Sequence, residues 1–266
     1  IQERSRRFCD EHLLPLEITC DEQDGLTPEQ LAPTYRGVLD ANLNAVNMPA
    51  EWGGQGMTIF EQVLSQEQLG RSTNALWDVV WRPANVLRYC TEEQRERFLI
   101  PEIEGKRRSC YAITEADAGS DPSHLATTAV RDGDHWVLTG EKTSISMADQ
   151  ADWAVVFART GTVESRAHGI SAFLVDMKAP GITTTRFDDL GQLAIGRGSI
   201  FFDGVRVPAG HMLGQEGSGF VQVMQGFDFS RALIGLQCIA AAQASLDESW
   251  AYVQERQAFG KPLADK

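Results

Sequence analysis

The segment Tyr111–Asp121, which reads YAITEADAGSD, carries the residues best suited to chemistry in this sequence. A strand-like start leads into a loop of small residues that also bears hydroxyl and carboxylate groups. Such a loop exposes backbone N–H groups and lets a flat or phosphorylated ligand approach closely. The same composition also fits a turn in which Ser and Asp satisfy only local backbone groups. The residues alone leave both interpretations open.

Other common signatures of chemistry are missing from the sequence. There is no GxGxxG after a strand, no GxxxxGK[ST], no HExxH and no GxSxG. The five histidines lack metal-ligand spacing, so we expect no metal site. The five cysteines are scattered and form no CxxC pair, which is typical of free, mostly buried thiols in a reducing compartment.

Three zones of the chain must position the Tyr111–Asp121 segment, and together they predict an α+β multidomain fold. Residues 1–108 are expected to form an N-terminal helical domain, with helix starts capped by Thr27 and Thr91. Residues 109–212 are expected to form a middle β domain, an antiparallel barrel or sandwich. Residues 213–266 begin a C-terminal helical domain, which we expect to be incomplete.

Within the middle zone, short β-rich runs alternate with clusters of Gly, Asp and Thr. The predicted strands are Trp136–Leu138, Trp153–Phe157, Ile170–Val175 and Ile200–Phe202. The clearest predicted turns are at residues 132–134 and at Asp203-Gly204.

The composition bounds the function. A formal net charge of −13 argues against nucleic acid as a partner, because phosphate binding requires clustered Lys and Arg. No apolar run approaches the roughly 20 residues that cross a membrane, and no leader segment is evident. We therefore expect a cytoplasmic protein without membrane contact. The chain starts without Met and stops inside a helical pattern, which predicts that the sequence is incomplete.

Five segments in order resemble the acyl-CoA dehydrogenase family of flavoproteins. YAITEADAGSD resembles the flavin-binding segment of that family. The other four segments are Met48–Gly54, Leu138–Lys142, Phe202–Pro208 and Arg256–Gly260 with the following Pro262-Leu263. They extend over most of the chain, so we identify the family from them.

The resemblance implies residues that bind FAD. It places Tyr111, Ile113 and Thr114 along the isoalloxazine ring, where backbone and hydroxyl groups meet its polar edge. It places Gly119 and Ser120 near the FAD pyrophosphate and the CoA arm of the substrate, so Ser120 is also a substrate-binding candidate. Hydrogen-bond donors of this kind tune a cofactor that itself carries the redox chemistry.

Two serines at the end of a predicted strand extend this set. Ser146 stands where the family commonly has Thr, whose hydroxyl can hydrogen-bond flavin N5; on its own it is also compatible with an ordinary strand-end hydroxyl. Ser144 stands where the family often has an aromatic residue packed against the flavin, which leaves one flavin face less covered. Ala116 and Asp117 replace the common Pro-Gly.

The third zone supplies further candidates by resemblance. Phe227–Arg231 is expected to open its first long helix, with Asp228 and Arg231 approaching the pantetheine or acyl part of the substrate. The alternative for this pair is an intrahelical ion pair worth about 0.2–0.5 kcal/mol. Arg256 and Phe259 are expected to contact the FAD of a neighbouring subunit, which implies a homo-oligomer, expected as a tetramer.

The implied reaction needs a carboxylate base that removes the α-proton of the acyl thioester. Some family members carry this Glu where the present chain has Ser230, which cannot act as that base. Other members place it in the last third of the chain, so we expect the base beyond Lys266 and name no catalytic residue within the sequence.

We therefore predict FAD-dependent α,β-dehydrogenation of an acyl-CoA to the 2-enoyl-CoA, in fatty acid or carboxylic acid degradation, with electrons passed to an electron-transferring flavoprotein. The alternatives are a flavin monooxygenase or acyl-carrier-protein dehydrogenase on the same scaffold, or a non-catalytic flavoprotein fragment. The acyl group stays open between straight, branched and alicyclic; Trp77, Trp81 and Arg82 are candidates for shaping a pocket for a bulky one.

Overall fold

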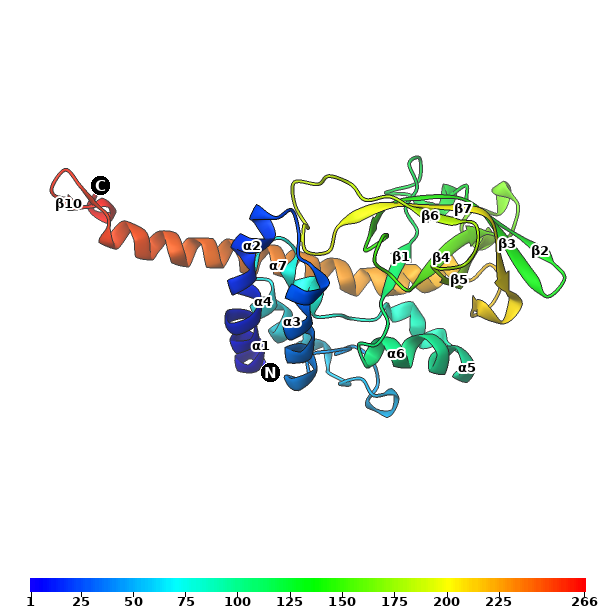
Figure 1. The fold of residues 1–266 in the computed structure, drawn as a ribbon, viewed down its shortest axis with the longest axis horizontal. Coiled ribbons are helices and arrows are strands. Elements are labelled where there is room, and N and C mark those ends of the chain that lie inside the picture. Colours follow the sequence, from blue (N-terminus) through cyan, green and yellow to red (C-terminus); the bar gives the residue numbers. More distant parts are fainter.

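The computed structural model describes residues 1–266, and its elements follow the three zones of the sequence (Figure 1). The first zone is helical, the second is dominated by one sheet, and the third consists mainly of one long helix. The α-helices are α1 (Gln2–Phe8), α2 (Glu17–Glu22), α3 (Pro28–Asp40), α4 (Ile59–Leu69), α5 (Glu92–Gln94), α6 (Ile100–Ile103) and α7 (Gly219–Glu255). None of these helices is both long and apolar enough to cross a lipid bilayer.

The predicted helix starts are confirmed in the first zone. Thr27 precedes α3 and Thr91 precedes α5, and each forms a capping box with the Gln three residues later. Thr58 caps α4 in the same way with Glu61. These side chains satisfy backbone N–H groups that a helix start would otherwise leave without a partner.

One eight-stranded sheet forms the middle of the chain, in the order β6-β7-β3-β2-β4-β5-β8, with β1 added against β4. Its strands are β1 (Ser109–Ala112), β2 (Thr128–Asp132), β3 (His135–Ser146), β4 (Trp153–Arg159), β5 (Ile170–Asp176), β6 (Ile182–Thr184), β7 (Arg197–Pro208) and β8 (Met212–Leu213). The pairings are antiparallel except that β1 and β2 run parallel to β4. The strand path is open and does not close into a ring, and the expected sheet-rich middle zone is confirmed.

Strand β4 lies at the centre of this sheet, and all seven of its residues are buried. Successive side chains of a strand point to opposite faces. Trp153, Val155 and Phe157 accordingly join a core shared with the first zone and α7, whereas Ala154 and Val156 join the core on the other face. Both faces of the sheet are therefore covered at the strand that carries β1.

Two local predictions are wrong. Asp203-Gly204 is not a turn but lies inside β7, where the register against β3 shifts between Leu138 and Gly140. Gly204 has φ +64°, a conformation that suits a bulge as well as a turn. The long helix begins at Gly219 rather than at Phe227, so Phe227–Arg231 lies well inside it.

Helix α7 runs along the long axis of the molecule, past the sheet and the N-terminal helices, and its C-terminal end projects beyond them (Figure 1). After it comes a short hairpin of β9 (Gln257–Ala258) and β10 (Lys261–Pro262). At its start, a Cβ on Gly219 would lie 2.8 Å from the backbone N of Ala172 in β5, so only glycine allows this close approach.

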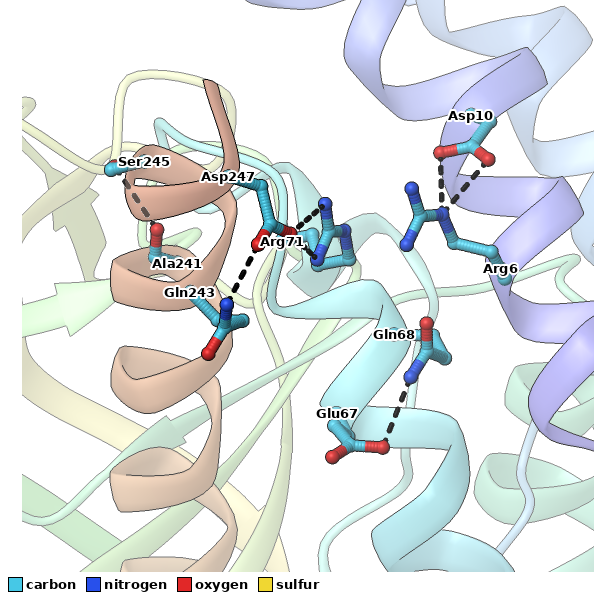
Figure 2. Close-up of polar contacts among 9 residues, drawn as sticks. All are labelled: Arg6, Asp10, Glu67, Gln68, Arg71, Ala241, Gln243, Ser245 and Asp247. Atoms are coloured by element: carbon cyan, nitrogen blue, oxygen red, sulfur yellow. Dashed lines mark hydrogen bonds and ion pairs between the residues drawn. The ribbon is translucent and has the colours of Figure 1, made fainter. Parts of the chain in front are cut away.

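A second close approach fixes α7 against the end of α4. A Cβ on Gly70 would lie 2.6 Å from the Cα of Gln237, and Gln66 accepts a buried hydrogen bond from the Gln237 amide. Further along α7, Asp247 forms an ion pair with Arg71, which follows α4 (Figure 2); the N–O distance is 3.3 Å. These contacts fix the position of α7 along its axis relative to the helices of the first zone.

Candidate active site

A cavity of about 490 Å³ lies where the first zone, the sheet and α7 meet. This volume falls within the range of roughly 300–1,000 Å³ that is usual for small-molecule sites. The sheet contributes Tyr111 and Ser146 to its wall, and α7 contributes Phe227 and Ser230. Trp77, Trp81 and Arg82 line it from the first zone; their role toward an acyl group stays a prediction.

Tyr111 connects the sheet to α7 at this cavity. Strand β1 pairs in parallel with β4, which places Tyr111 beside Val155. The ring of Tyr111 lies 5.1 Å from that of Phe157 and 5.9 Å from that of Phe227, both in tilted arrangements. Aromatic pairs at such distances are favourable beyond their buried area. Burial raises the pKa of the Tyr111 phenol well above its usual value, so it stays neutral.

The loop after Tyr111 is held by a buried ion pair. Lys142 on β3 is fully buried; its Nζ donates to Glu115 Oε1 at 2.6 Å and to the carbonyl of Ile113 at 3.1 Å. Glu115 also accepts from the backbone N–H groups of Ala126 at 2.5 Å and Thr127 at 3.0 Å. The pair thus joins two successive parts of the loop to the sheet.

The charges of this pair follow from its surroundings. Burial raises the pKa of Glu115, but Lys142 and the backbone donors outweigh it, so the carboxyl pKa is lowered overall. Burial lowers the pKa of Lys142 to about 8, against the opposing effect of Glu115. The pair is therefore ionised at neutral pH. Lys142 points inward because it lies on the same face of β3 as the buried residues Trp136 and Leu138. This alternation is already visible in the sequence.

The end of β3 presents hydroxyl groups that the chain itself does not use. Ser144 has φ +56° where the β3–β7 register shifts, and Ser144 and Ser146 are both exposed, with hydroxyls that make no hydrogen bond inside the chain. The Thr143 hydroxyl, directly before Ser144, accepts a hydrogen bond from the Ser199 hydroxyl at 3.1 Å. The Thr114 carbonyl accepts from the Thr143 N–H at 2.9 Å, which brings the loop alongside this strand end.

The loop tip is open to solvent. A Cβ added at Gly119 would meet no atom within 4 Å, and Ser120 beside it is exposed. Asp121, in contrast, accepts from the Ser123 N–H at 3.0 Å and so serves the local turn. The open residues of the loop tip and the unused hydroxyls of Ser144 and Ser146 are the kind of groups that a hydrogen-bonding ring system and its phosphates require.

Buried charges line the cavity wall, and of these residues only Arg82 is among the candidates from the sequence. Burial raises the pKa of Glu102 to about 8 and that of Asp78 to about 6. Burial also lowers the pKa of Arg82 to about 10 and lowers that of Arg108. No spacing in the sequence marks the other three, because Asp78 lies in a short turn, Glu102 near the end of the short helix α6, and Arg108 just before β1. Perturbed groups of this kind in a cavity are typical of functional sites.

The candidates on α7 separate into two groups. Ser230 lies in the cavity wall, with its hydroxyl bonded to the Gly226 carbonyl at 3.1 Å. Asp228 and Arg231 are mostly exposed and do not line the cavity; their closest N–O distance is 3.9 Å. Arg256 and Phe259 follow the projecting end of α7, and the Phe259 ring is 96% exposed. The structure therefore does not bring these last four residues to the cavity.

Three domain families match the chain in order. The N-terminal domain of acyl-CoA dehydrogenase matches residues 1–106, the middle domain residues 110–205 and the C-terminal domain residues 217–266. The chain belongs to the acyl-CoA dehydrogenase family. The resemblance read from the five segments is confirmed by these matches.

Related proteins agree with this family. The chain is 34% identical to the mitochondrial short-chain specific acyl-CoA dehydrogenase of Bos taurus, covering 99% of this chain and 64% of that protein. It is 32% identical to CarC, a subunit of the caffeyl-CoA reductase-Etf complex of Acetobacterium woodii, covering 100% and 70%. The structure of butyryl-CoA dehydrogenase from Megasphaera elsdenii superimposes with a TM-score of 0.89 at 28% identity, covering 99% and 70%. The chain thus spans about two thirds of the length of these relatives.

Proposed function

We propose that this chain takes part in the FAD-dependent α,β-dehydrogenation of an acyl-CoA thioester, with electrons passed to an electron-transferring flavoprotein. The observation that carries the proposal is the cavity that joins Tyr111 and Ser146 of the sheet to Phe227 and Ser230 of α7. Membership of the family supports the proposal, because relatives are named as acyl-CoA dehydrogenases and as a subunit of a caffeyl-CoA reductase-Etf complex.

The residues at the strand end and loop fit FAD. Tyr111, Ile113 and Thr114 are proposed to lie along the isoalloxazine ring, with Ser144 and Ser146 at its edge. Gly119 and Ser120 are proposed to meet the pyrophosphate and the CoA arm. When bound, FAD supplies a two-electron acceptor for the hydrogen removed from the β-carbon.

The remaining residues of the chain position the substrate and exclude water. The acyl group is proposed to enter the cavity between the sheet and α7, so that apolar walls around Leu233 remove solvent from the reacting carbons. Asp228 and Arg231 are proposed to meet the pantetheine arm outside the cavity. Ser230 offers no carboxylate at its place in the wall, so no base is assigned to this chain.

The wider assembly follows the same proposal. Arg256 and Phe259 are proposed to contact the FAD of a neighbouring subunit in a homotetramer, which agrees with their place on the projecting end of α7 (Figure 1). We also propose that the protein has three domains, formed by residues 1–108, 109–212 and 213–266. Its proposed location is the cytoplasm.

Anaerobic titration of the FAD-loaded protein tests this function. Straight, branched and alicyclic acyl-CoAs are added while the flavin absorbance near 450 nm is recorded, and at least one is expected to bleach it. Oxygen consumption coupled to a hydroxylated product would instead identify a monooxygenase. A flavin that no thioester of CoA or acyl carrier protein reduces would identify a non-catalytic flavoprotein.

A further inference from the structure

The cavity carries a cluster of charged side chains that the proposed dehydrogenation does not use. This charged cluster consists of Asp78, Arg82, Glu102 and Arg108, all in the cavity wall. Asp78 lies in the short 3₁₀ turn Leu76–Val79, and Arg108 directly precedes β1. Enclosing four ionisable groups beside apolar walls is costly unless each finds a partner.

The two arginines keep hydrogen-bond donors that the chain does not satisfy. Arg82 donates from Nη2 to Gln62 at 3.2 Å, but its Nε is buried without a partner, as is the neighbouring Trp81 Nε1. Arg108 stacks on the Tyr35 ring with its guanidinium carbon 3.4 Å from the centroid, and its guanidinium makes no hydrogen bond within the chain. No acid of the cluster lies within 4.0 Å of either guanidinium. Several donors therefore remain available to a ligand.

Glu102 adds an unused oxygen in the same wall. It is 5% exposed, its Oε1 accepts from the Ser109 hydroxyl at 2.9 Å, and its Oε2 is buried without a partner. Because burial raises the pKa of Glu102 to about 8, this acid is protonated at neutral pH and can donate rather than repel. Burial also raises the pKa of Asp78, but only to about 6, so it is largely ionised. Within this cluster of four side chains, the two arginines then exceed the one ionised acid by one positive charge; Arg107, also in the wall, is paired with Asp176 at 3.5 Å.

The charged cluster and Tyr111 lie at opposite ends of the cavity. Arg108 precedes Tyr111 by three residues along an extended segment, which corresponds to about 10 Å. A ligand whose reacting carbons lie beside Tyr111 and Ser146 would thus meet the charges only at its far end. The groups that approach this end are Tyr35 of α3, Asp78 of the turn, Arg82 shortly after it, Glu102 of α6, Arg108 before β1, and Asp152, which accepts from the Arg108 backbone N–H at 3.0 Å.

We propose that the cavity selects acyl groups that end in a carboxylate, and that Arg82 and Arg108 bind this carboxylate together with the Glu102 carboxyl group. This inference rests on the function proposed above and names its substrate class. An arginine fork matches the two oxygens of a carboxylate, and such charged hydrogen bonds are strong in enclosed surroundings. The surplus positive charge is local, in a chain whose net charge is −13.

The test compares acyl-CoAs of equal chain length that differ only at the far end. Isothermal titration calorimetry of the FAD-loaded protein would use valeryl-CoA against glutaryl-CoA, hexanoyl-CoA against adipoyl-CoA and octanoyl-CoA against suberoyl-CoA. In at least one pair we expect the carboxylate-ended member to bind about 10- to 100-fold more tightly, the effect of one or two charged hydrogen bonds. The thioester end is shared, so the ratio reports the far end alone.

Variants then test which residues cause the preference for carboxylate-ended acyl groups. Arg108→Met and Arg82→Met are each expected to reduce the ratio at least fivefold, whereas Arg36→Met, an exposed arginine on α3, should keep it. Circular dichroism confirms that each variant is folded, and Arg108→Lys tests whether the fork rather than the charge is needed.

The outcomes keep this inference apart from the function on which it rests. If methyl-ended thioesters bleach the flavin and bind as tightly as their carboxylate partners in all three pairs, the proposed selectivity is wrong while dehydrogenation stands. Tightest binding of hydroxyl-ended thioesters would also overturn it. If no thioester bleaches the flavin, the proposed dehydrogenation itself fails.

Discussion

Replacing Lys142 with Met removes the ammonium that ties the loop after Tyr111 to the sheet. Removing one partner of a buried ion pair typically costs about 3–5 kcal/mol. We expect the lower part of this range, about 3 kcal/mol, because Glu115 keeps the N–H groups of Ala126 and Thr127 as donors. The double variant Lys142→Met/Glu115→Gln leaves no buried charge and should recover about 1–2 kcal/mol of this loss.

The assay is urea unfolding followed by tryptophan fluorescence, with the free energy extrapolated to water. Lys106→Met is the matched control, since its pair with Glu104 at 2.8 Å is exposed and such pairs contribute about 0–1 kcal/mol. Because the folded state lowers the pKa of Lys142 from 10.5 to about 8, it binds fewer protons than the unfolded state between these values. Wild-type stability should therefore rise with pH across this window, and the Lys142→Met variant should lose that rise.

Two results would refute this reasoning. One is a Lys142→Met variant within about 0.5 kcal/mol of the wild type, as expected only for an exposed pair. The other is a double variant no more stable than the single one, which would mean that the remaining carboxylate carries no cost.

Three further predictions concern α7, the cavity and the flavin site. Gly70→Ala should destabilise by about 1–3 kcal/mol because its Cβ meets α7, while Gly235→Ala, with open space around it, should stabilise by about 0.5–1 kcal/mol; equal urea midpoints would contradict the close approach. Burial raises the pKa of Glu102 from 4.5 to about 8, so wild-type stability should fall over that pH range by on the order of 3–5 kcal/mol. Glu102→Gln should remove this fall in stability. If the variant and the wild type show the same dependence of stability on pH, Glu102 is not protonated in the folded protein. Ser146→Ala should weaken FAD binding to the apoprotein about 2- to 10-fold by fluorescence titration, the value of one hydrogen bond; an unchanged affinity would place its hydroxyl away from the flavin.

The parts of the site that could be predicted are those built from local patterns. The composition of Tyr111–Asp121 marks it as a candidate, the family resemblance assigns it to the flavin, and its first residue lies in the cavity wall. The capped helix starts followed from Thr and Gln at fixed spacing, which is a local signal. The roles of Asp228 and Arg231 stay predictions, since their exposed side chains only show that they lie outside the cavity.

The parts that could not be predicted depend on long-range packing. Asp203-Gly204 has the residues of a turn, but the same positive φ serves a bulge, and only pairing with β3 decides between them. Most of the charged cluster is equally hidden, because only tertiary packing brings Glu102 of α6 and Arg108, just before β1, into the wall of one cavity. Burial, rather than residue type, makes these groups chemically distinctive.

The most direct test of the central claim is product analysis during anaerobic flavin reduction. The FAD-loaded protein is mixed with an acyl-CoA in equal amount, the flavin absorbance is followed, and the thioester is analysed by mass spectrometry. The account predicts a 2-enoyl-CoA, lighter by two hydrogens, in proportion to the flavin reduced, with reoxidation by an electron-transferring flavoprotein. Unchanged thioester beside fully oxidised flavin, for every acyl group in the panel, would contradict it.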